Sequence, residues 1–445
     1  MEILPVFYLL LSVILLLILI VRFGVHPFLT LLIIGLFLGL ADGMSFEKTL
    51  ESLLDGFAGT LRWIGIVMVF GTIIGEILTE TGASKRISTS ILQLVGKKRV
   101  PLTMGLTGYI VSISVFSDIA YIMLQSITES LTVKSKRTIL VVGLSLTAGL
   151  AATHALIPPT PGPLAASGIL GADLGKVILI NTFVAIVSVI GGLLWVTLYC
   201  KKIELPYDRE LRKRFESKEA ILTKTEKTPK ILGSYAPILL PLILIAVGSF
   251  VSKQDESLIF GLLKFLGSPV IALFIGMLLA ANLLERKGRI KRIYKLLDRS
   301  IEKAAVVIMV TGAGGAFGSV IKASNISGSV SSIIESTGIP GVLFPFLLAM
   351  ALTTSTGSIT VSMVTSSAVV APLIGALGIS PEMAVALIGA GSLSIIHANS
   401  SFFWLLHKLH DVPPNILYRT LSVKTLCMGL SGFIAAIILW LFGVH

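Results

Sequence analysis

Apolar runs of about twenty residues recur along this chain and restrict the folds open to it. Two examples are LPVFYLLLSVILLLILIV (4–21) and YAPILLPLILIAVGSFV (235–251). A helix needs roughly 20 such residues to cross the hydrocarbon core of a membrane. Only 13% of the 445 residues are charged and 54% are hydrophobic, whereas about a quarter of a soluble domain is charged. The sequence therefore predicts an all-α polytopic protein in the lipid bilayer of the cytoplasmic (inner) membrane.

Two features that suggest other classes have simpler interpretations. The run at 4–21 is too long for a signal peptide, has no basic residues before it and no small-residue cleavage site after it. The net charge of +12 would suggest a nucleic-acid partner in a soluble protein, but here short loops hold the excess, so none is expected. Cys200 and Cys427 lie at or inside predicted spans and indicate no disulfide.

Basic loops predict the orientation of the chain. The loop 201–230 holds ten Lys and Arg residues against six acidic ones, and the loop 285–303 holds eight against three. Two further basic patches contain Lys85, Arg86, Lys97, Lys98 and Arg99, and Lys134, Lys136 and Arg137. Placing all four patches in the cytoplasm leaves both termini outside.

This orientation predicts two re-entrant hairpins. The apolar stretch 100–133 has basic, cytoplasmic residues at both ends, so it enters and returns on the same side. The stretch 341–378 lies between the weakly basic segment 324–340 and Ser380, both outside, so it re-enters from the other face.

Membrane helices are predicted at about 4–22, 25–41, 62–81, 138–157, 175–200, 234–252, 269–284, 304–323, 382–406 and 418–443. Weakly basic outer segments are 41–60 and 253–268, and an amphipathic surface helix is predicted at 45–63.

An internal repeat with an offset of 243 residues relates the two halves. Residues 62–170 are predicted as a helix, a hairpin from the inside and a broken helix, and residues 304–410 repeat this order with the hairpin from the outside. The matching pairs are Gly71 and Gly314, Gly75 and Gly318, Ser88 and Ser331, Ser112 and Ser355, and His154 and His397. Inverted repeats are typical of secondary transporters, whose substrate site lies between the halves.

Helix breakers occur at equivalent places in both repeats. The stretch AATHALIPPTPGPLAASG (151–168) contains four prolines, and an open backbone at membrane depth is tolerated only inside protein or beside a water-filled cavity. A new helix is expected to start near Leu164, with its N-terminus favouring an anion. The alternative is a plain loop at the outer surface. The equivalent break in the second repeat is predicted at HANSSFFW (397–404).

Polar residues within apolar stretches are the candidates for function. Asp118, near the first hairpin tip, is a functional candidate because a carboxylate at membrane depth is costly; the alternative is a surface residue of a misplaced loop. His154 and His397 occupy equivalent positions in the two repeats and are candidate proton carriers. The alternative is that each is a core residue whose ring nitrogens are hydrogen-bonded within the protein. The second hairpin carries TTSTGSITVSMVTSS (353–367). Since Ser and Thr also bond to their own helix, only the tip at Ser355–Thr360 is favoured.

Motifs typical of enzymes are missing from the sequence. GADLGKV (171–177) has the wrong spacing for a phosphate-binding loop, and GAGGAFG (312–318) is better explained by close helix packing. The chain has no zinc-binding HExxH motif, cysteine cluster or nucleophile elbow. We therefore expect no enzyme, no cofactor and no metal.

Four segments share the pattern of a known family, namely GFAGTLRWIGIVMVFGTIIGEILTETGASKRI (56–87), THALIPPTPGP (153–163), ADLGK (172–176) and GISPEMAVALIGAGSLSIIHANSSFFW (378–404). They resemble the gluconate permease family of proton symporters, within the ion transporter superfamily. The resemblance implies a sugar-acid symporter with scaffold and transport domains, paired hairpins, and elevator motion in a homodimer.

The chain departs from this family's pattern at three places. The family commonly has Phe-Glu where this chain has Ser117-Asp118, which keeps the carboxylate. It commonly has arginine at the position of Thr353 and aspartate at the position of Ser400. The joint loss of one cation and one anion suggests that an ion pair has been replaced, so the substrate need not be gluconate.

These observations lead to one hypothesis and its alternatives. The chain is predicted to be an inverted-repeat secondary transporter that takes up a small hydroxylated carboxylate together with a proton. Sodium coupling or another organic anion is the alternative within transport, and a channel or a lipid-modifying enzyme are the alternatives outside it.

The proton-coupling candidates are Asp118 and then His154. The substrate-binding candidates are Ser117, Asp118, Thr153, His154, Thr160, Gly162, Ser355, Thr356, Gly357, Ser358, Thr360, His397, Asn399 and Ser400. The predicted domains are N-terminal scaffold helices with the amphipathic helix (1–61), a first inverted repeat (62–200), a cytoplasmic basic loop (201–233), scaffold helices with a basic loop (234–303), a second inverted repeat (304–410) and a C-terminal helix (411–445).

Overall fold

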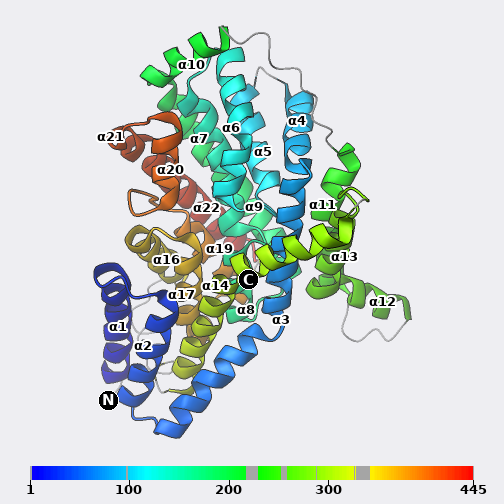
Figure 1. Cartoon of the computed structure of the whole chain (residues 1–445). Coiled ribbons are helices and arrows are strands. Elements are labelled where there is room, and N and C mark those ends of the chain that lie inside the picture. The colour runs from blue at the N-terminus through cyan, green and yellow to red at the C-terminus, as the bar shows by residue number, and fades with distance from the viewer. Residues whose placement is uncertain are drawn as a thin grey trace.

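The structure is a computed structural model in which helices and short connections make up the whole described chain (Figure 1). It describes residues 3–96, 99–216, 229–251, 258–286, 288–324, 326 and 341–443. Six helices within these ranges are long and apolar enough to cross a membrane, or up to eight if each of two bent pairs counts as one span. The prediction of an all-α polytopic membrane protein is confirmed.

Two groups of helices flank the centre of the molecule (Figure 1). On one side lie α1 (Ile3–Leu17), which continues into a π-helical turn at Ile18–Arg22, and α2 (Pro27–Ala41). On the other side lie α11 (Ile231–Phe250), α12 (Leu258–Gly267) and α13 (Pro269–Ala281). The sequence predicted no helix within the weakly basic segment 253–268, but α12 lies there and meets α13 at an angle of 68°. Residues 252–257 lie outside the described chain.

Two long helices, α3 (Phe46–Glu80) and α14 (Arg289–Ala323), pack against each other. A β-carbon added at Gly56 would lie 2.4 Å from the Gly315 carbonyl oxygen, so glycine permits this close approach. Glu76 and Lys303 add an ion pair between the two helices. The amphipathic helix predicted at 45–63 corresponds to the first part of α3, which bends by 41° between Arg62 and Ile64 and continues as the next span.

Both predicted hairpins are present. The first consists of α5 (Val100–Val111) and α6 (Ser117–Lys134), joined by residues 112–116. The second consists of α16 (Leu343–Thr356) and α17 (Ile359–Val370), which is followed by a 3-10 turn at Ala371–Leu373 and by α18 (Ile374–Leu377). The first tip rests on α3, where a β-carbon at Gly75 would lie 1.7 Å from the Ser114 carbonyl oxygen.

Both broken helices are present, with shifted boundaries. The first consists of α7 (Ile139–Leu156) and α8 (Pro161–Leu170), and the second of α19 (Pro381–Ser392) and α20 (Ser401–His410). The first new helix starts at Pro161 rather than near Leu164, since proline suits the first helical position. The second break spans 393–400 rather than 397–404. It begins early because the Ile396 amide donates to Oγ1 of Thr425, at 3.0 Å, instead of to its own helix.

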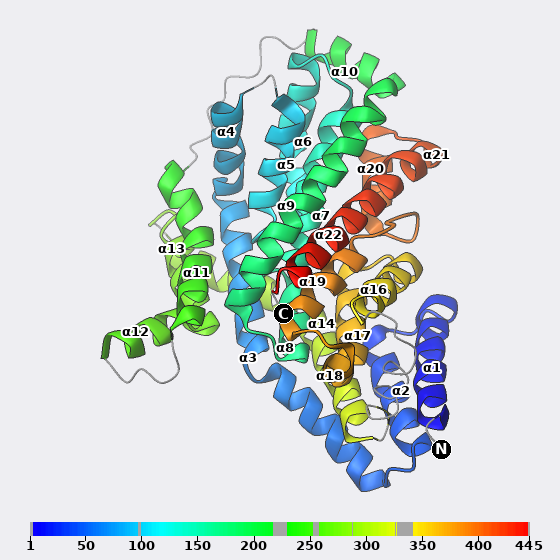
Figure 2. The ribbon, with the colours of Figure 1, turned by 180° about the vertical axis from the view of Figure 1, so that it is seen from behind.

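The two repeats interlock. The helices that close them, α9 (Leu174–Leu198) and α22 (Val423–Leu441), pack against each other (Figure 2). A short helix α21 (Pro414–Leu417) and a π-helical turn at Tyr418–Ser422 precede α22, and a 3-10 turn at Cys200–Lys202 follows α9. The arm α17 of the second hairpin packs on α8 of the first repeat. In the same way, Tyr121 of α6 hydrogen-bonds to His410 of α20. The matched Ser331 lies outside the described residues.

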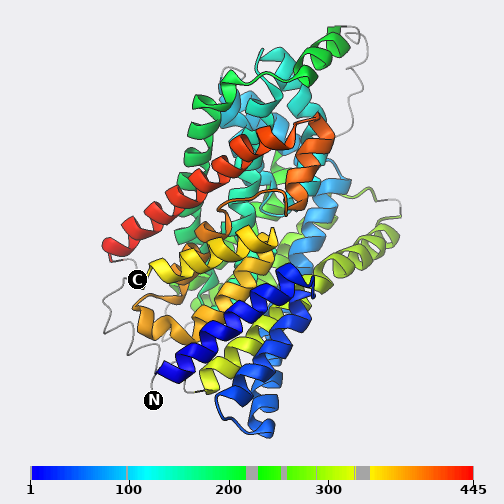
Figure 3. The same cartoon turned by 90° about the vertical axis from the view of Figure 1, so that its left-hand side faces the viewer.

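Two helices that the sequence did not predict lie at the end where α6 turns into α7 (Figure 3). They are α4 (Ala83–Val95) and α10 (Pro206–Glu216). The buried carboxylate of Asp208 in α10 accepts the amide hydrogens of Ile139, at 2.7 Å, and Leu205, at 2.9 Å. Burial raises the pKa of Asp208, and the two amide donors oppose part of that rise. The predicted basic residues Lys97 and Lys98 and those in 217–228 lie outside the described chain.

Candidate functional site

A cavity of about 250 Å³ lies where the two repeats meet. Its walls come from the first hairpin tip, the last turns of α7, the second hairpin tip and the second break. Ligand pockets commonly measure about 300 to 1,000 Å³, so this cavity suits a small solute. The lining residues are Phe116, Ser117, Asp118, Ala151, His154, Gly357, Ser358, Ile359, Thr360, Ile396, Ser400, Ser401 and Phe402.

Three helices begin at this cavity. The first residues of α6 (from Ser117), α17 (from Ile359) and α20 (from Ser401) all line it. The first N–H groups of a helix have no partner within that helix, and the helix dipole makes this end positive. The cavity can therefore hold an anion through backbone donors and the hydroxyl groups beside them.

Asp118 is the charged residue among those that line the cavity. It is the second residue of α6, where the helix dipole favours a carboxylate. Its Oδ2 accepts a hydrogen bond of 3.3 Å from the hydroxyl group of Ser401, which belongs to the second repeat. Asp118 therefore places a half-buried carboxylate at the meeting point of three helix N-termini, in contact with both repeats.

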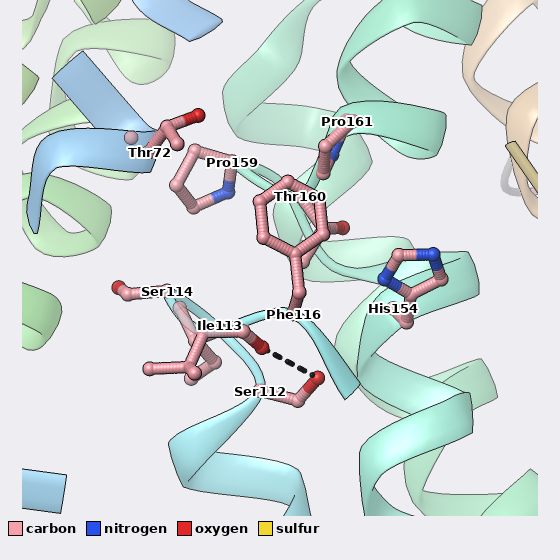
Figure 4. A pocket seen from close by; sticks show the side chains of 11 residues that line it. Thr72, Ser112, Ile113, Ser114, Phe116, His154, Pro159, Thr160 and Pro161 are labelled. Atoms are coloured by element: carbon pink, nitrogen blue, oxygen red, sulfur yellow. Dashed lines mark hydrogen bonds between the residues drawn. The ribbon is translucent and has the colours of Figure 1, made fainter. Parts of the chain in front are cut away.

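His154 borders both the cavity and a smaller void beside it (Figure 4). The void measures about 20 Å³, enough for one water molecule. The ring of His154 faces that of Phe116, with 6.4 Å between the ring centres. Its Nδ1 is buried and has no hydrogen-bond partner among the residues described. At the tip of the first hairpin, which borders this void, the Ser112 hydroxyl group donates a hydrogen bond to the Val115 carbonyl oxygen at 3.2 Å.

Three candidates from the first break lie outside the main cavity. The hydroxyl group of Thr153 is buried and donates to the Tyr109 carbonyl oxygen at 2.8 Å. Thr160 lines only the small void and donates to the Ile157 carbonyl oxygen. Gly162 lets α8 approach α17, since a β-carbon there would lie 2.7 Å from the Met363 sulfur. These three residues shape the break rather than the cavity surface.

His397 and Asn399 hold the second hairpin tip instead of lining the cavity. Nε2 of His397 and Nδ2 of Asn399 lie 2.8 Å and 2.7 Å from the carbonyl oxygen of Thr354, near the end of α16. Gly357 follows with a left-handed φ of +72°, and a β-carbon there would lie 2.3 Å from the Asn399 carbonyl oxygen. The second break is thus a clamp on the tip of its own hairpin.

The remaining tip residues divide between the cavity and their own helix. The hydroxyl groups of Ser355 and Thr356 donate to the carbonyl oxygens of Ala351 and Leu352 within α16 and do not line the cavity. Seven of the fourteen candidates do line it, namely Ser117, Asp118, His154, Gly357, Ser358, Thr360 and Ser400.

Sequence reasoning missed the apolar wall of this site, the hydroxyl group of Ser401 and a buried lysine outside the lining, Lys424. The apolar wall, which includes Phe116 and Phe402, carries no signal that separates it from ordinary membrane helix. Ser401 could have been chosen, because it follows Ser400 in the predicted break. Lys424 is fully buried in α22, and the rule that identified Asp118, an ionisable residue in an apolar run, applies to it equally.

Comparison with known proteins gives a consistent result over nearly the whole chain. The model of the family described as GntP family permease matches residues 4–443. A gluconate permease of Pseudomonas aeruginosa is 32% identical over 436 residues, covering 97% of this chain and 96% of that protein. The Gnt-II system L-idonate transporter of Escherichia coli (strain K12) is 30% identical over 437 residues, covering 95% and 97%.

The fold is also similar to that of a solved structure. The crystal structure of the Alcanivorax borkumensis YdaH transporter, described as having an unusual topology, superposes with a TM-score of 0.67. The match covers 94% of this chain and 99% of that one, with 16% sequence identity. At this identity the likeness concerns the fold alone.

Proposed function

Because this chain belongs to the GntP permease family, we propose that it takes up a small hydroxylated carboxylate, such as gluconate or a related sugar acid, by proton-coupled symport. Membership makes the chain an integral membrane transporter and not an enzyme. The names of the similar gluconate and L-idonate transporters support a sugar acid as substrate.

The convergence of three helix N-termini on one hydroxyl-lined cavity carries the proposal. A sugar acid has one carboxylate and several hydroxyl groups. In the proposal the carboxylate binds backbone N–H groups at the helix starts, and the hydroxyl groups bind side chains such as Ser358, Thr360 and Ser400. Among the lining residues there is no lysine or arginine, so the helix ends supply the nearest positive potential.

Asp118 is the proposed proton-coupling residue, with His154 as the second candidate. Two carboxylates about 6 Å apart repel each other by roughly 3 kcal/mol at an effective dielectric constant near 20. A substrate anion is therefore accepted far better when Asp118 is protonated, and the proton and the substrate bind together. The loss of the proton on the opposite side would then favour release of the substrate.

Sodium coupling, or an organic anion other than a sugar acid, is the second candidate. It is favoured by the oxygen-rich second hairpin tip and by Thr353 and Ser400, which stand where the family commonly has arginine and aspartate. Hydroxyl and carbonyl oxygens are the ligands that hard cations prefer.

The orientation and the movement belong to the same proposal. We place the basic patches in the cytoplasm and both termini outside, in the inner membrane. We further propose a homodimer in which the two repeats carry the substrate by elevator motion against the flanking helices.

Binding by the purified protein tests the substrate proposal. A panel of sugar acids and other hydroxy acids is titrated with and without sodium, and uptake into proteoliposomes is then driven by a pH gradient. Gluconate-type acids should bind without sodium and accumulate when the outside is acidic. Accumulation that needs a sodium gradient and ignores the pH gradient would instead support the second candidate.

A further inference from the structure

Lys424 is a buried lysine in the first turn of α22. The residue has no exposed surface, and its Nζ donates to Oγ1 of Thr147 in α7 at 2.6 Å. Thr147 donates its own hydrogen to the Leu144 carbonyl oxygen, so its oxygen is free to accept. In the described chain Lys424 forms no ion pair. Burying a charged amine without a counter-charge costs much free energy. A hydrogen bond to one hydroxyl group does not explain why a lysine occupies this position.

Two independent contacts place Lys424 directly behind the cavity wall. Thr147 lies four residues before Ala151, a lining residue on the same helix, and four residues of helix rise about 6 Å. The next residue, Thr425, accepts the amide hydrogen of Ile396, also a lining residue, at 3.0 Å. From these contacts we estimate that the amine lies on the order of 10 Å from the cavity, beside two of the segments that form its wall.

We propose that Lys424 supplies the positive charge that makes this cavity select an anion over an uncharged polyol. The amine acts through the wall without touching the substrate, because electrostatic attraction is weakly screened in a buried region. A bound carboxylate in turn stabilises the charged form of the amine. This inference rests on the proposed function, since it requires an anionic substrate.

The charges of Lys424 and Asp118 also balance in both states that would cross the membrane. In the empty carrier, ionised Asp118 and charged Lys424 sum to zero. In the loaded carrier, Asp118 is neutral, and the substrate carboxylate and Lys424 again sum to zero. Without Lys424 both states would carry one uncompensated negative charge, which is costly at membrane depth.

The test compares the binding of gluconate with that of gluconamide, its uncharged amide, at fixed pH and salt. The wild-type protein should prefer gluconate. Lys424→Gln keeps a donor for Thr147 but removes the charge, and Lys424→Met removes both. Each variant should lose roughly tenfold in gluconate affinity, the effect of one charge at this distance, while gluconamide binding stays unchanged. Lys424→Arg should keep the preference, and Lys322→Met, at an exposed lysine of α14, serves as the matched control.

Comparing two ligands on one protein separates a charge effect from a folding defect, which would lower both affinities together. If Lys424→Met does not fold, Lys424→Gln alone decides the result. A wild-type preference for gluconate that survives in Lys424→Gln would overturn the inference and leave the proposed function standing. Wild-type protein that binds no sugar acid of the panel would overturn both.

Discussion

The hydroxyl group of Ser401 donates a hydrogen bond of 3.3 Å to Oδ2 of Asp118, so the tip of the first hairpin is held by the first residue of α20 in the second repeat. The same two helices meet again where the Tyr121 hydroxyl group lies 2.9 Å from Nε2 of His410. Ionised Asp118 is the better acceptor for Ser401. Protonation of Asp118 should therefore both remove a charge from the cavity and loosen a contact between the repeats.

Asp118→Asn mimics the protonated carboxyl group and tests the proposed coupling. We expect uptake driven by a pH gradient to fall at least tenfold, because the empty carrier can no longer release a proton. Exchange of internal for external substrate should continue, since exchange never requires the empty carrier to return. Both activities are measured in proteoliposomes with labelled gluconate. Parent-like uptake with parent-like pH dependence would exclude Asp118 as the coupling residue.

His154→Gln separates the second coupling candidate from the first. The ring borders the cavity and the small void, so its loss should weaken substrate contact in uptake and exchange alike. We expect both rates to fall by a similar factor. A selective loss of pH-driven uptake would instead assign proton coupling to His154.

Gly357→Ala tests whether the second hairpin tip needs glycine. Alanine at a φ of +72° costs about 1 kcal/mol, and its β-carbon would lie 2.3 Å from the Asn399 carbonyl oxygen. The tip must shift, so we expect a lower thermal unfolding midpoint and a KM for gluconate raised at least fivefold. Gly59→Ala in α3 is the control, because a β-carbon there meets no atom within 4 Å. Equal behaviour of the two variants would refute a special role for Gly357.

The sequence predicted the spans, the hairpins and the first helix break because a membrane restricts which backbone conformations and side chains can be buried in it. Apolar length predicts spans, basic loops predict hairpins and termini, and prolines at depth predict a break beside a cavity. Asp118 stood out for the same reason, since few ionisable residues occur in apolar segments. These signals are local, and the hairpins and the first break were therefore found nearly in place.

What the sequence could not supply depends on contacts between distant segments. The second break begins early because Thr425 takes the Ile396 amide hydrogen. Likewise, His397 and Asn399 turn toward the Thr354 carbonyl oxygen rather than the cavity. Neither partner is implied by spacing along the chain. The packing of α3 through Gly56 likewise depends on α14, a segment more than 200 residues further along the chain.

Cysteine accessibility tests the proposed orientation. The sequence predicts opposite sides for Ser217 and Ser327, two positions outside the described residues. Within the described chain, Lys134 at the end of α6 and Glu47 near the start of α3 are both exposed. In a background with Cys200→Ala and Cys427→Ala, a membrane-impermeant reagent should label Glu47→Cys in intact cells and Lys134→Cys only after lysis. Labelling of both in intact cells would contradict the orientation.

Asp208→Asn tests the anchor between α10 and α7. The variant keeps one acceptor oxygen, so it loses one of two amide contacts, worth about 1 kcal/mol. Burial raises the pKa of Asp208 above its usual value of about 3.9. The folded state therefore binds this proton more tightly than the unfolded chain, and the contribution of Asp208 to stability declines as pH rises through the interval between the two pKa values. Thermal unfolding midpoints, measured from about pH 4 upward, should decline less steeply with rising pH in Asp208→Asn than in the parent. Parallel curves for the two proteins would argue against a contribution of Asp208 to this pH dependence.

Asn399→Ala tests whether the clamp on the second hairpin sets substrate affinity without setting proton coupling. The variant removes one of the two donors to the Thr354 carbonyl oxygen and leaves His397 in place. One such hydrogen bond contributes about 1 kcal/mol, so a looser tip should raise the KM for gluconate roughly fivefold. The dependence of uptake on pH should stay that of the parent, because Asp118 lies on the other hairpin and keeps its contact with Ser401. Asn282→Ala, at an asparagine that caps α13 away from the cavity, is the matched control and should leave KM unchanged. A shift of the pH profile in Asn399→Ala would mean that the two hairpin tips act as one unit, and the assignment of coupling to the first hairpin alone would then be wrong.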